Sequence, residues 1–217
     1  MDRDWPPDCD LSSKGEKQAE TLGKEWKDVH IDYLYSSTMK RTYETALAVS
    51  THNKGQPQVM QDEMLVKRKM GQVTLEFARK GEREAAEDSF YGKNKFDREY
   101  QPPGGGESMS MLSARACSTL VELLKRHGKD MDTPPDLPGL WGPGLEIERN
   151  TPEITTPPDS TLVDGLPHVV VVSHNAFLTM FYEEMYSWDS QWRSTDCGYH
   201  NTAWWVNFLP VLQGSQC

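Results

Sequence analysis

Four consecutive valines, Val169 to Val172, are followed directly by Ser173 and His174. An unbroken β-branched run is typical of a strand that is buried on both faces of a parallel sheet. Residues 176–186 then have the pattern of a helix. His174 is therefore expected where a parallel strand ends and a helix begins, a place that favours ligand binding and attracts anions. The alternative is that His174 only forms a hydrogen bond to a loop. Other parts of the chain are needed to choose between these two roles.

A second strand–helix unit precedes this one in the sequence. Residues 31–35 (IDYLY) alternate in character and predict a short strand. The following Ser36, Ser37 and Thr38 are typical caps of a helix over residues 39–50. Arg41 is then expected in the first turn of that helix.

Three more elements are predicted by spacing and capping residues. They are a helix that starts at Ser12 or Ser13 and runs to about residue 27, a strand near residues 58–60, and a helix capped by Ser108 that reaches Arg126. Residues 202–209 (TAWWVNFL) are expected to form a final strand. Residues 131–167 are polar and rich in proline, which predicts a surface insertion in a single domain of residues 1–217.

Composition excludes several classes of function. The net charge is −10, which makes a broad surface for nucleic acid or an acidic membrane unexpected. No apolar run is long enough to span a membrane, and no signal peptide is recognised, so we expect a cytoplasmic protein. The four cysteines have no C-x-x-C spacing, and neither a metal nor a disulfide framework is predicted. The histidines His30, His52, His168 and His200 fit no constellation and are expected to be structural or exposed.

Four motifs in order along the chain resemble those of one protein family. They are residues 11–19 (LSSKGEKQA), 35–45 (YSSTMKRTYET), 103–108 (PGGGES) and 172–175 (VSHN). Together they resemble the histidine phosphatase superfamily, also described as phosphoglycerate mutase-like. The glycine-rich turn and the long insertion resemble its fructose-2,6-bisphosphatase-like regulator branch. The resemblance implies an α/β fold with three layers, α/β/α, around a mostly parallel sheet. We expect no cofactor and no metal.

The family resemblance also implies a phosphohistidine mechanism. A histidine in an Arg-His-Gly motif after the first strand attacks phosphorus, a second histidine and two arginines hold the phosphoryl oxygens, and a glutamate protonates the leaving oxygen. His174 matches the second histidine and is the one catalytic residue carried over. The phosphate-binding positions matched in this chain are Arg41, Ser37, His174, Asn201 and Thr202.

Two essential family residues have no match. The first strand and its Arg-His-Gly are missing, and Lys67 stands in residues 65–71 (LVKRKMG) where the family motif has glutamate. The tripeptide Arg126-His127-Gly128 follows a helical stripe instead of a strand, and we interpret it as a helix end with Gly128 at C′. Lys67, Arg68 and Lys69 are interpreted as a solvated charge run, with Lys67 and Glu107 kept as candidate pocket residues.

The preferred hypothesis is a diverged pseudophosphatase that keeps a pocket for phosphate or another anion, with a phosphorylated small molecule as its partner. Two alternatives stay open. One is a phosphomonoesterase of the family, truncated at its N-terminus, that acts on sugar phosphates. The other is a repurposed enzyme that uses His174 as a general base. Loss of a central strand would leave a gap in the sheet or rearrange it, and an exposed sheet edge would favour a homodimer.

Overall fold

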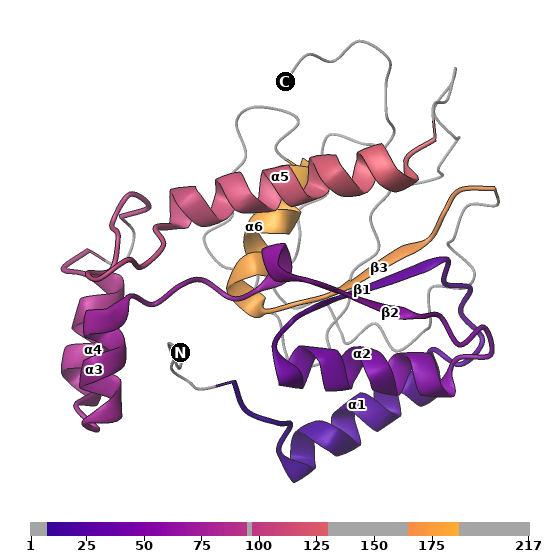
Figure 1. Cartoon of the computed structure of the whole chain (residues 1–217), viewed down its shortest axis with the longest axis horizontal. Helices are drawn as coiled ribbons and strands as arrows, with labels where there is room; N and C mark the ends of the chain where they lie inside the picture. Colours follow the sequence, from indigo (N-terminus) through magenta and orange to yellow (C-terminus); the bar gives the residue numbers. More distant parts are fainter. Residues whose placement is uncertain (1–7, 95–96, 130–164, 187–217) are drawn as a thin grey trace, which may run out of the picture.

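The computed structural model of the chain describes residues 8–94, 97–129 and 165–186 (Figure 1). The elements in order are α1 (Ser13–Glu25), β1 (Tyr33–Ser37), α2 (Lys40–His52), β2 (Val59–Asp62), the 3₁₀ turn η1 (Glu63–Leu65), α3 (Gln72–Arg79), α4 (Arg83–Tyr91), α5 (Met109–His127), β3 (Val169–Val172) and α6 (Asn175–Tyr186). The predicted strand at residues 202–209 and nearly all of the predicted insertion lie outside the described residues.

The sheet of the described residues has the strand order β2-β1-β3, and both pairs are parallel. Tyr33 is paired with Val169 and Ser36 with Val172. Helices α1 and α2 cover one face of this sheet, and α5 and α6 cover the other (Figure 1). The α/β fold with three layers is therefore confirmed.

Successive side chains of a strand point to opposite faces of the sheet, so each strand contributes to the apolar cores on both faces. In β1, Leu34 packs in the cluster with α1 and α2, whereas Tyr35 packs in the cluster with α5 and α6. In β3, Val170 and Val172 contact the first cluster, and Val169 and Val171 contact the second. Such alternation follows from the two-residue period of a strand. A sheet covered on both faces needs apolar residues at every position, which explains the unbroken valine run.

The valine strand differs from expectation in its burial. All four of its valines are half-buried, not fully buried. Both faces of β3 have apolar neighbours, but in the described part of the sheet β3 is an outer strand and hydrogen-bonds to β1 alone. Since β1 and β3 pair directly, the described sheet has no gap between them.

Helix caps account for the agreement between prediction and structure at the starts of two helices, α1 and α5. The Ser12 Oγ accepts a hydrogen bond from the Gly15 N–H, and the Ser108 Oγ accepts one from the Met111 N–H, as their capping roles predict. The prediction for α2 was wrong in detail: its N-cap is Met39, because Ser36 and Ser37 belong to β1. The strand predicted at residues 31–35 accordingly lies two residues later, at Tyr33–Ser37.

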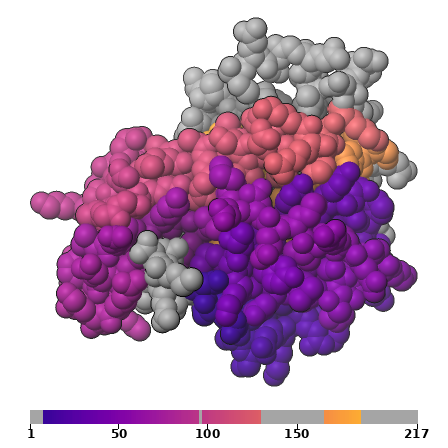
Figure 2. Space-filling model, viewed as in Figure 1, coloured from indigo at the N-terminus to yellow at the C-terminus, as the bar shows by residue number. Residues whose placement is uncertain are grey.

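Helices α3 and α4 pack against each other and form a lobe at one end of the molecule (Figure 2). The lobe joins the chain through the segment 66–71, which also passes near the carboxyl end of the sheet. No helix in the described ranges is long and apolar enough to cross a membrane.

Candidate anion-binding site

The carboxyl ends of β1 and β3 bring Ser37 and His174 to the same edge of the sheet. Ser37 is the last residue of β1, and His174 lies two residues beyond the end of β3. Arg41 is the second residue of α2, the helix that follows β1. The strand register therefore gathers three side chains that are as far as 137 positions apart in the sequence.

His174 lies between the other two side chains and touches both. Its Nδ1 is 3.0 Å from the Nη2 of Arg41, and its Nε2 is 3.1 Å from the Oγ of Ser37. A guanidinium group can only donate, so Nδ1 accepts and the proton of the neutral ring is on Nε2. The Nε2–H then donates to the Ser37 Oγ, which also accepts from the Met39 N–H at 3.3 Å. The contacts of His174 thereby select one tautomer of the imidazole.

Burial, together with the positive charges of Arg41, Lys67 and Arg115, lowers the pKa of His174 from its ordinary 6.5 to about 3. The imidazole is therefore neutral at physiological pH. The same three cations mark this edge of the sheet as locally positive, although the whole chain has a net charge of −10. A local cationic site is compatible with an acidic protein because nearby charges dominate the field in a partly buried place.

Arg41 offers hydrogen-bond donors that the described residues do not use. Its Nη1 atom is buried and has no hydrogen-bond partner among them. A buried guanidinium N–H without an acceptor costs free energy, so such groups normally face a ligand or water. A tetrahedral oxyanion suits this donor, because guanidinium groups bind phosphate oxygens through two parallel N–H groups.

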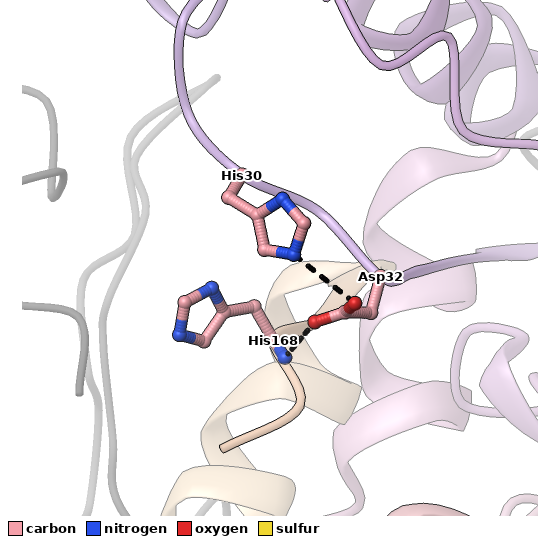
Figure 3. Close-up of side chains that lie close together, drawn as sticks. All are labelled: His30, Asp32 and His168. Carbon is pink, nitrogen blue, oxygen red and sulfur yellow. Dashed lines mark hydrogen bonds and ion pairs between the residues drawn. The ribbon is translucent and has the colours of Figure 1, made fainter. Parts of the chain in front are cut away.

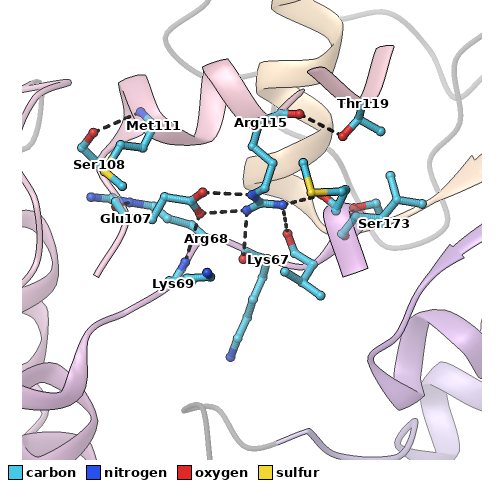
Figure 4. A network of polar contacts seen from close by, with 12 residues as sticks. Lys67, Arg68, Lys69, Glu107, Ser108, Met111, Arg115, Thr119 and Ser173 are labelled. Atoms are coloured by element: carbon cyan, nitrogen blue, oxygen red, sulfur yellow. Dashed lines mark hydrogen bonds and ion pairs between the residues drawn. The ribbon is translucent and has the colours of Figure 1, made fainter. Parts of the chain in front are cut away.

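A buried ion pair supports the segment next to this site (Figure 4). The Arg115 guanidinium of α5 forms a two-pronged contact with the Glu107 carboxylate, with nitrogen–oxygen distances of 2.9 and 2.8 Å. The same guanidinium donates to the backbone carbonyls of Met64, Val66 and Lys67. Arg115 thus fixes the backbone around Lys67, whose side chain points away from the ion pair in Figure 4.

The expectation of a solvated charge run at residues 67–69 is wrong for Arg68. Arg68 is buried, its Nε donates to the carbonyl of Glu107 at 2.6 Å, and its guanidinium lies over the ring of Phe90. Lys67 is half-buried and Lys69 is exposed. The long arginine side chain lets its charged end reach backbone acceptors while its stem stays among apolar groups. Sequence alone has no signal that distinguishes one cation of such a run from the next.

The structure places the predicted site residues in three groups. Ser37, Arg41 and His174 are joined by hydrogen bonds, and Lys67 is close enough to lower the pKa of His174. Glu107 lies in the ion pair with Arg115, so its carboxylate is engaged. Asn201 and Thr202 lie outside the described residues. Sequence reasoning overlooked Arg115, although an arginine three residues after Leu112 in an apolar stripe signals a partly buried cation.

The Arg126-His127-Gly128 tripeptide ends α5, as expected of a helix terminus. Gly128 is the C-cap at φ −61°, so the expected C′ glycine geometry was wrong; the helix ends without a left-handed residue. The His127 Nε2 is 2.8 Å from the hydroxyl of Tyr35, and its ring stacks on Tyr33 at the amino end of β1. His127 is therefore remote from the carboxyl end, where His174 lies.

Comparison with known proteins adds a family to this geometry. The family model described as histidine phosphatase superfamily (branch 1) matches residues 4–131, a span that contains Arg41 but not His174. The chain is 31% identical over 125 residues to phosphoserine phosphatase 1 of Hydrogenobacter thermophilus, which covers 55% of each protein. It is 34% identical over 125 residues to a metal-independent phosphoserine phosphatase of Arabidopsis thaliana, covering 55% of this chain and 50% of that protein.

A longer match extends beyond the family model. The chain is 26% identical over 180 residues to fructose-2,6-bisphosphatase TIGAR B of Danio rerio, covering 79% of this chain and 62% of that protein. These alignments span about half to three fifths of the relatives' own lengths.

Solved structures agree on the fold. A mycobacterial glucosyl-3-phosphoglycerate phosphatase superposes with a TM-score of 0.51 at 20% identity, covering 82% of this chain and 68% of that one. The alpha-ribazole phosphatase of Shigella flexneri superposes with a TM-score of 0.50 at 16% identity, covering 81% and 66%. Similarity at this level of identity concerns the fold alone.

Proposed function

Because the chain belongs to the histidine phosphatase superfamily (branch 1), we propose that Arg41, Ser37 and His174 bind the phosphate group of a small phosphorylated molecule. The observation that carries the proposal is the buried Nη1 of Arg41, which has no partner among the described residues and lies on a guanidinium that touches His174. Phosphate oxygens would accept from this nitrogen. Lys67 would add positive charge from the next segment.

We further propose that this chain binds the phosphate group without transferring it. In the family motif a glutamate supplies the leaving-group proton, and here Lys67 has that position, which favours anion binding and removes a carboxylic acid. Glu107 is a poor substitute because its carboxylate is paired with Arg115 in a buried contact. His127 of the Arg-His-Gly tripeptide contacts Tyr33 and Tyr35, remote from His174. These three placements support a pseudophosphatase.

The low pKa of His174 bears on the third hypothesis, a repurposed enzyme with His174 as general base. An imidazole whose conjugate acid has a pKa of about 3 is a weak base at neutral pH. Its Nδ1 lone pair is also used by Arg41. The proposal therefore assigns His174 to orienting Arg41 and Ser37, whose N–H and O–H groups would donate to the phosphate oxygens.

A phosphomonoesterase acting on sugar phosphates is the second candidate, in which residues not contained in these 217 supply the nucleophile. The family and the phosphatase names of the relatives favour it. The two candidates share the anion site and differ in turnover, so one set of experiments separates them.

The test combines phosphate binding to the 217-residue chain with measurements of turnover. Titration calorimetry with inorganic phosphate, phosphoserine and a sugar monophosphate measures binding to the unaltered protein and to Arg41→Met. Arg83→Met, at an exposed position that begins α4, is the matched control. Loss of charge-assisted hydrogen bonds worth about 1.5–3 kcal/mol predicts at least tenfold weaker phosphate binding by Arg41→Met and no change in the control.

A third variant, Lys67→Glu, tests the role of the lysine. It replaces a positive charge near His174 with a negative one and is expected to weaken phosphate binding by at least tenfold. Hydrolysis of p-nitrophenyl phosphate is measured in parallel. Turnover is measured on the 217-residue chain and on the same chain extended at its N-terminus by a strand with an Arg-His-Gly motif. A folded extended chain that binds phosphate without turnover supports the pseudophosphatase, and turnover by it that disappears in Arg41→Met favours the phosphomonoesterase. Equal phosphate affinity in Arg41→Met and the unaltered protein overturns the anion site itself.

A further inference from the structure

A second cluster of side chains lies at the opposite end of the sheet (Figure 3). His30 and Asp32 belong to the segment that leads into β1, and His168 immediately precedes β3. One ligating atom from each of the three residues lies within 4.8 Å of the others. His30 is exposed, as expected, but the sequence does not suggest that it lies close to Asp32 and His168, because residues more than 130 positions apart meet where the two parallel strands begin.

We propose that His30, Asp32 and His168 bind a divalent cation of the zinc class. Two imidazoles and one carboxylate are a common ligand set for Zn²⁺, Co²⁺ and Ni²⁺, which accept both nitrogen and oxygen ligands. Three protein ligands leave at least one coordination position for water. The proposal is independent of the anion site, because it rests on different residues.

The distances within the cluster fit a shared metal ion. The His30 Nε2 and the Asp32 Oδ1 are 3.1 Å apart. Two ligands that are each about 2.0–2.2 Å from one metal ion are separated by about 3.0–3.5 Å at tetrahedral or octahedral angles. A cation would replace the proton that these two atoms share. The ligating nitrogen of the half-buried His168 lies within 4.8 Å of the other two atoms, so its ring has to turn toward them to complete the set.

Backbone hydrogen bonds hold the carboxylate in place for this role. The Asp32 Oδ2 accepts from the backbone N–H of His168 at 2.8 Å, and the backbone N–H of Asp32 donates to the His168 carbonyl at 3.0 Å. These contacts orient Asp32 and leave its Oδ1 facing His30. Orientation of a ligating carboxylate by a hydrogen bond to its second oxygen is a usual feature of metal sites.

Access and charge also suit a cation. The side chains of His30 and Asp32 are 68% and 34% exposed, so an ion can enter from solvent. The net charge of −10 attracts cations to the protein in general. The anion site gathers cations instead, at the other ends of the same two strands, and the four to five residues of each strand separate the sites by more than about 12 Å.

The test uses the full 217-residue chain, freed of metal with EDTA and dialysed. Binding of Co²⁺ is followed by its visible absorption, Zn²⁺ is measured by competition and by equilibrium dialysis, and thermal unfolding is recorded with and without Zn²⁺. The variants are His30→Ala, His168→Ala and Asp32→Asn, of which the last keeps an oxygen that accepts the His168 N–H. The controls are His52→Gln and Cys9→Ser, which remove ligand types elsewhere in the chain.

We expect one Zn²⁺ per chain, a higher Tm with Zn²⁺, and at least tenfold weaker binding in each of the three variants, with the controls unchanged. Equal Tm values of the variants and the unaltered protein in EDTA would show that the weaker zinc binding is not caused by a loss of folding. Zinc binding that survives both His30→Ala and His168→Ala overturns the proposal, as does a chain that binds neither Co²⁺ nor Zn²⁺.

Discussion

At the scale of single residues, His174 owes its properties to two neighbours and to burial. Arg41 donates to one ring nitrogen, and Ser37 accepts from the other. Protonation of Nδ1 would set two donors against each other in a partly dehydrated place, so the neutral form is strongly preferred. A bound phosphate would add negative charge beside the ring and raise its pKa again, which couples proton uptake to ligand binding.

The pKa of His174 predicts a pH dependence of stability. The pKa is about 3 in the folded protein and 6.5 when the group is free. Between these values the unfolded chain binds more protons, so the contribution of His174 is complete above about pH 6.5 and is lost progressively as the pH falls toward 3. Between about pH 7.5 and about pH 4.5, the free energy of unfolding in urea should fall by about 2 kcal/mol more in the unaltered protein than in His174→Asn.

His174→Asn is suited to this comparison because asparagine does not titrate and its amide oxygen can accept from Arg41. His52→Gln provides a control at a histidine whose ring bonds to the carbonyl of Ala48 in α2. Parallel pH profiles for the unaltered protein and His174→Asn would show that the ring is not buried in its neutral form.

At the scale of elements, helix α5 supports the anion site through one side chain. Arg115 projects from α5 and donates to the Met64 carbonyl in η1 and to the carbonyls of Val66 and Lys67 just after it, while Glu107 just before α5 neutralises its charge. Gly71, at the end of that segment, has φ +78°, and a Cβ there would lie 2.4 Å from the carbonyl oxygen of Pro103. The backbone around Lys67 is thus anchored from both sides.

Removal of the Glu107 charge is expected to destabilise the fold. The Glu107 and Arg115 side chains are only 7% and 11% exposed, so Glu107→Gln leaves a buried guanidinium without its counter-charge. Breaking such a pair costs about 3 kcal/mol or more, measured as the free energy of unfolding in urea. Glu122→Gln on the exposed side of α5, where Glu122 pairs with Lys125, should change stability by less than about 0.5 kcal/mol.

The same variant separates structural from ligand-binding roles. If Glu107 acts only through Arg115, the phosphate affinity of the folded fraction of Glu107→Gln should equal that of the unaltered protein. Any loss of total binding should then match the loss of folded protein. A double variant that also replaces Arg115 with methionine should recover part of the stability, since the buried charge is then absent. The single and double variants form a double-mutant cycle. If the changes in the free energy of unfolding at the two positions are additive, this account of the ion pair is contradicted.

At the scale of the whole molecule, two apolar clusters enclose the sheet. One joins β1 and β3 to α5 and α6, with Leu112 and Phe177 fully buried, and the other joins the strands to α1 and α2 around Leu34. Both candidate sites lie at the ends of the strands between these clusters. Their geometry therefore depends on the packing of both faces.

Leu112 provides a test of this packing. Leu112→Ala should lower the free energy of unfolding by about 2–5 kcal/mol, because the side chain is completely buried and its removal leaves a cavity. Met111→Ala at the neighbouring position of α5, 48% exposed, should change it by less than about 0.5 kcal/mol. Similar losses for the two variants, measured by urea unfolding, would show that α5 is not packed as the structure places it.

Local sequence patterns were sufficient for most of the described elements. Ser12 and Ser108 marked the starts of α1 and α5, and the apolar stripe after Ser108 predicted the length of α5 to within one residue. The valine run predicted β3 and the turn into α6. Capping and periodicity involve residues a few positions apart, so both can be recognised in the sequence without knowledge of the tertiary structure. The predicted end of a strand was wrong where its last residues are polar, as at Ser36 and Ser37 of β1.

The sequence by itself determined most of the elements, the family resemblance, and the matches of Ser37, Arg41 and His174 to phosphate-binding positions. Only the tertiary structure decided that Arg68 is buried, that Glu107 is engaged by Arg115, and that His30, Asp32 and His168 meet. The physical reason is range. Propensity and periodicity depend on near neighbours in the chain, whereas burial and side-chain pairing depend on strand register and helix packing, which bring together residues far apart in sequence.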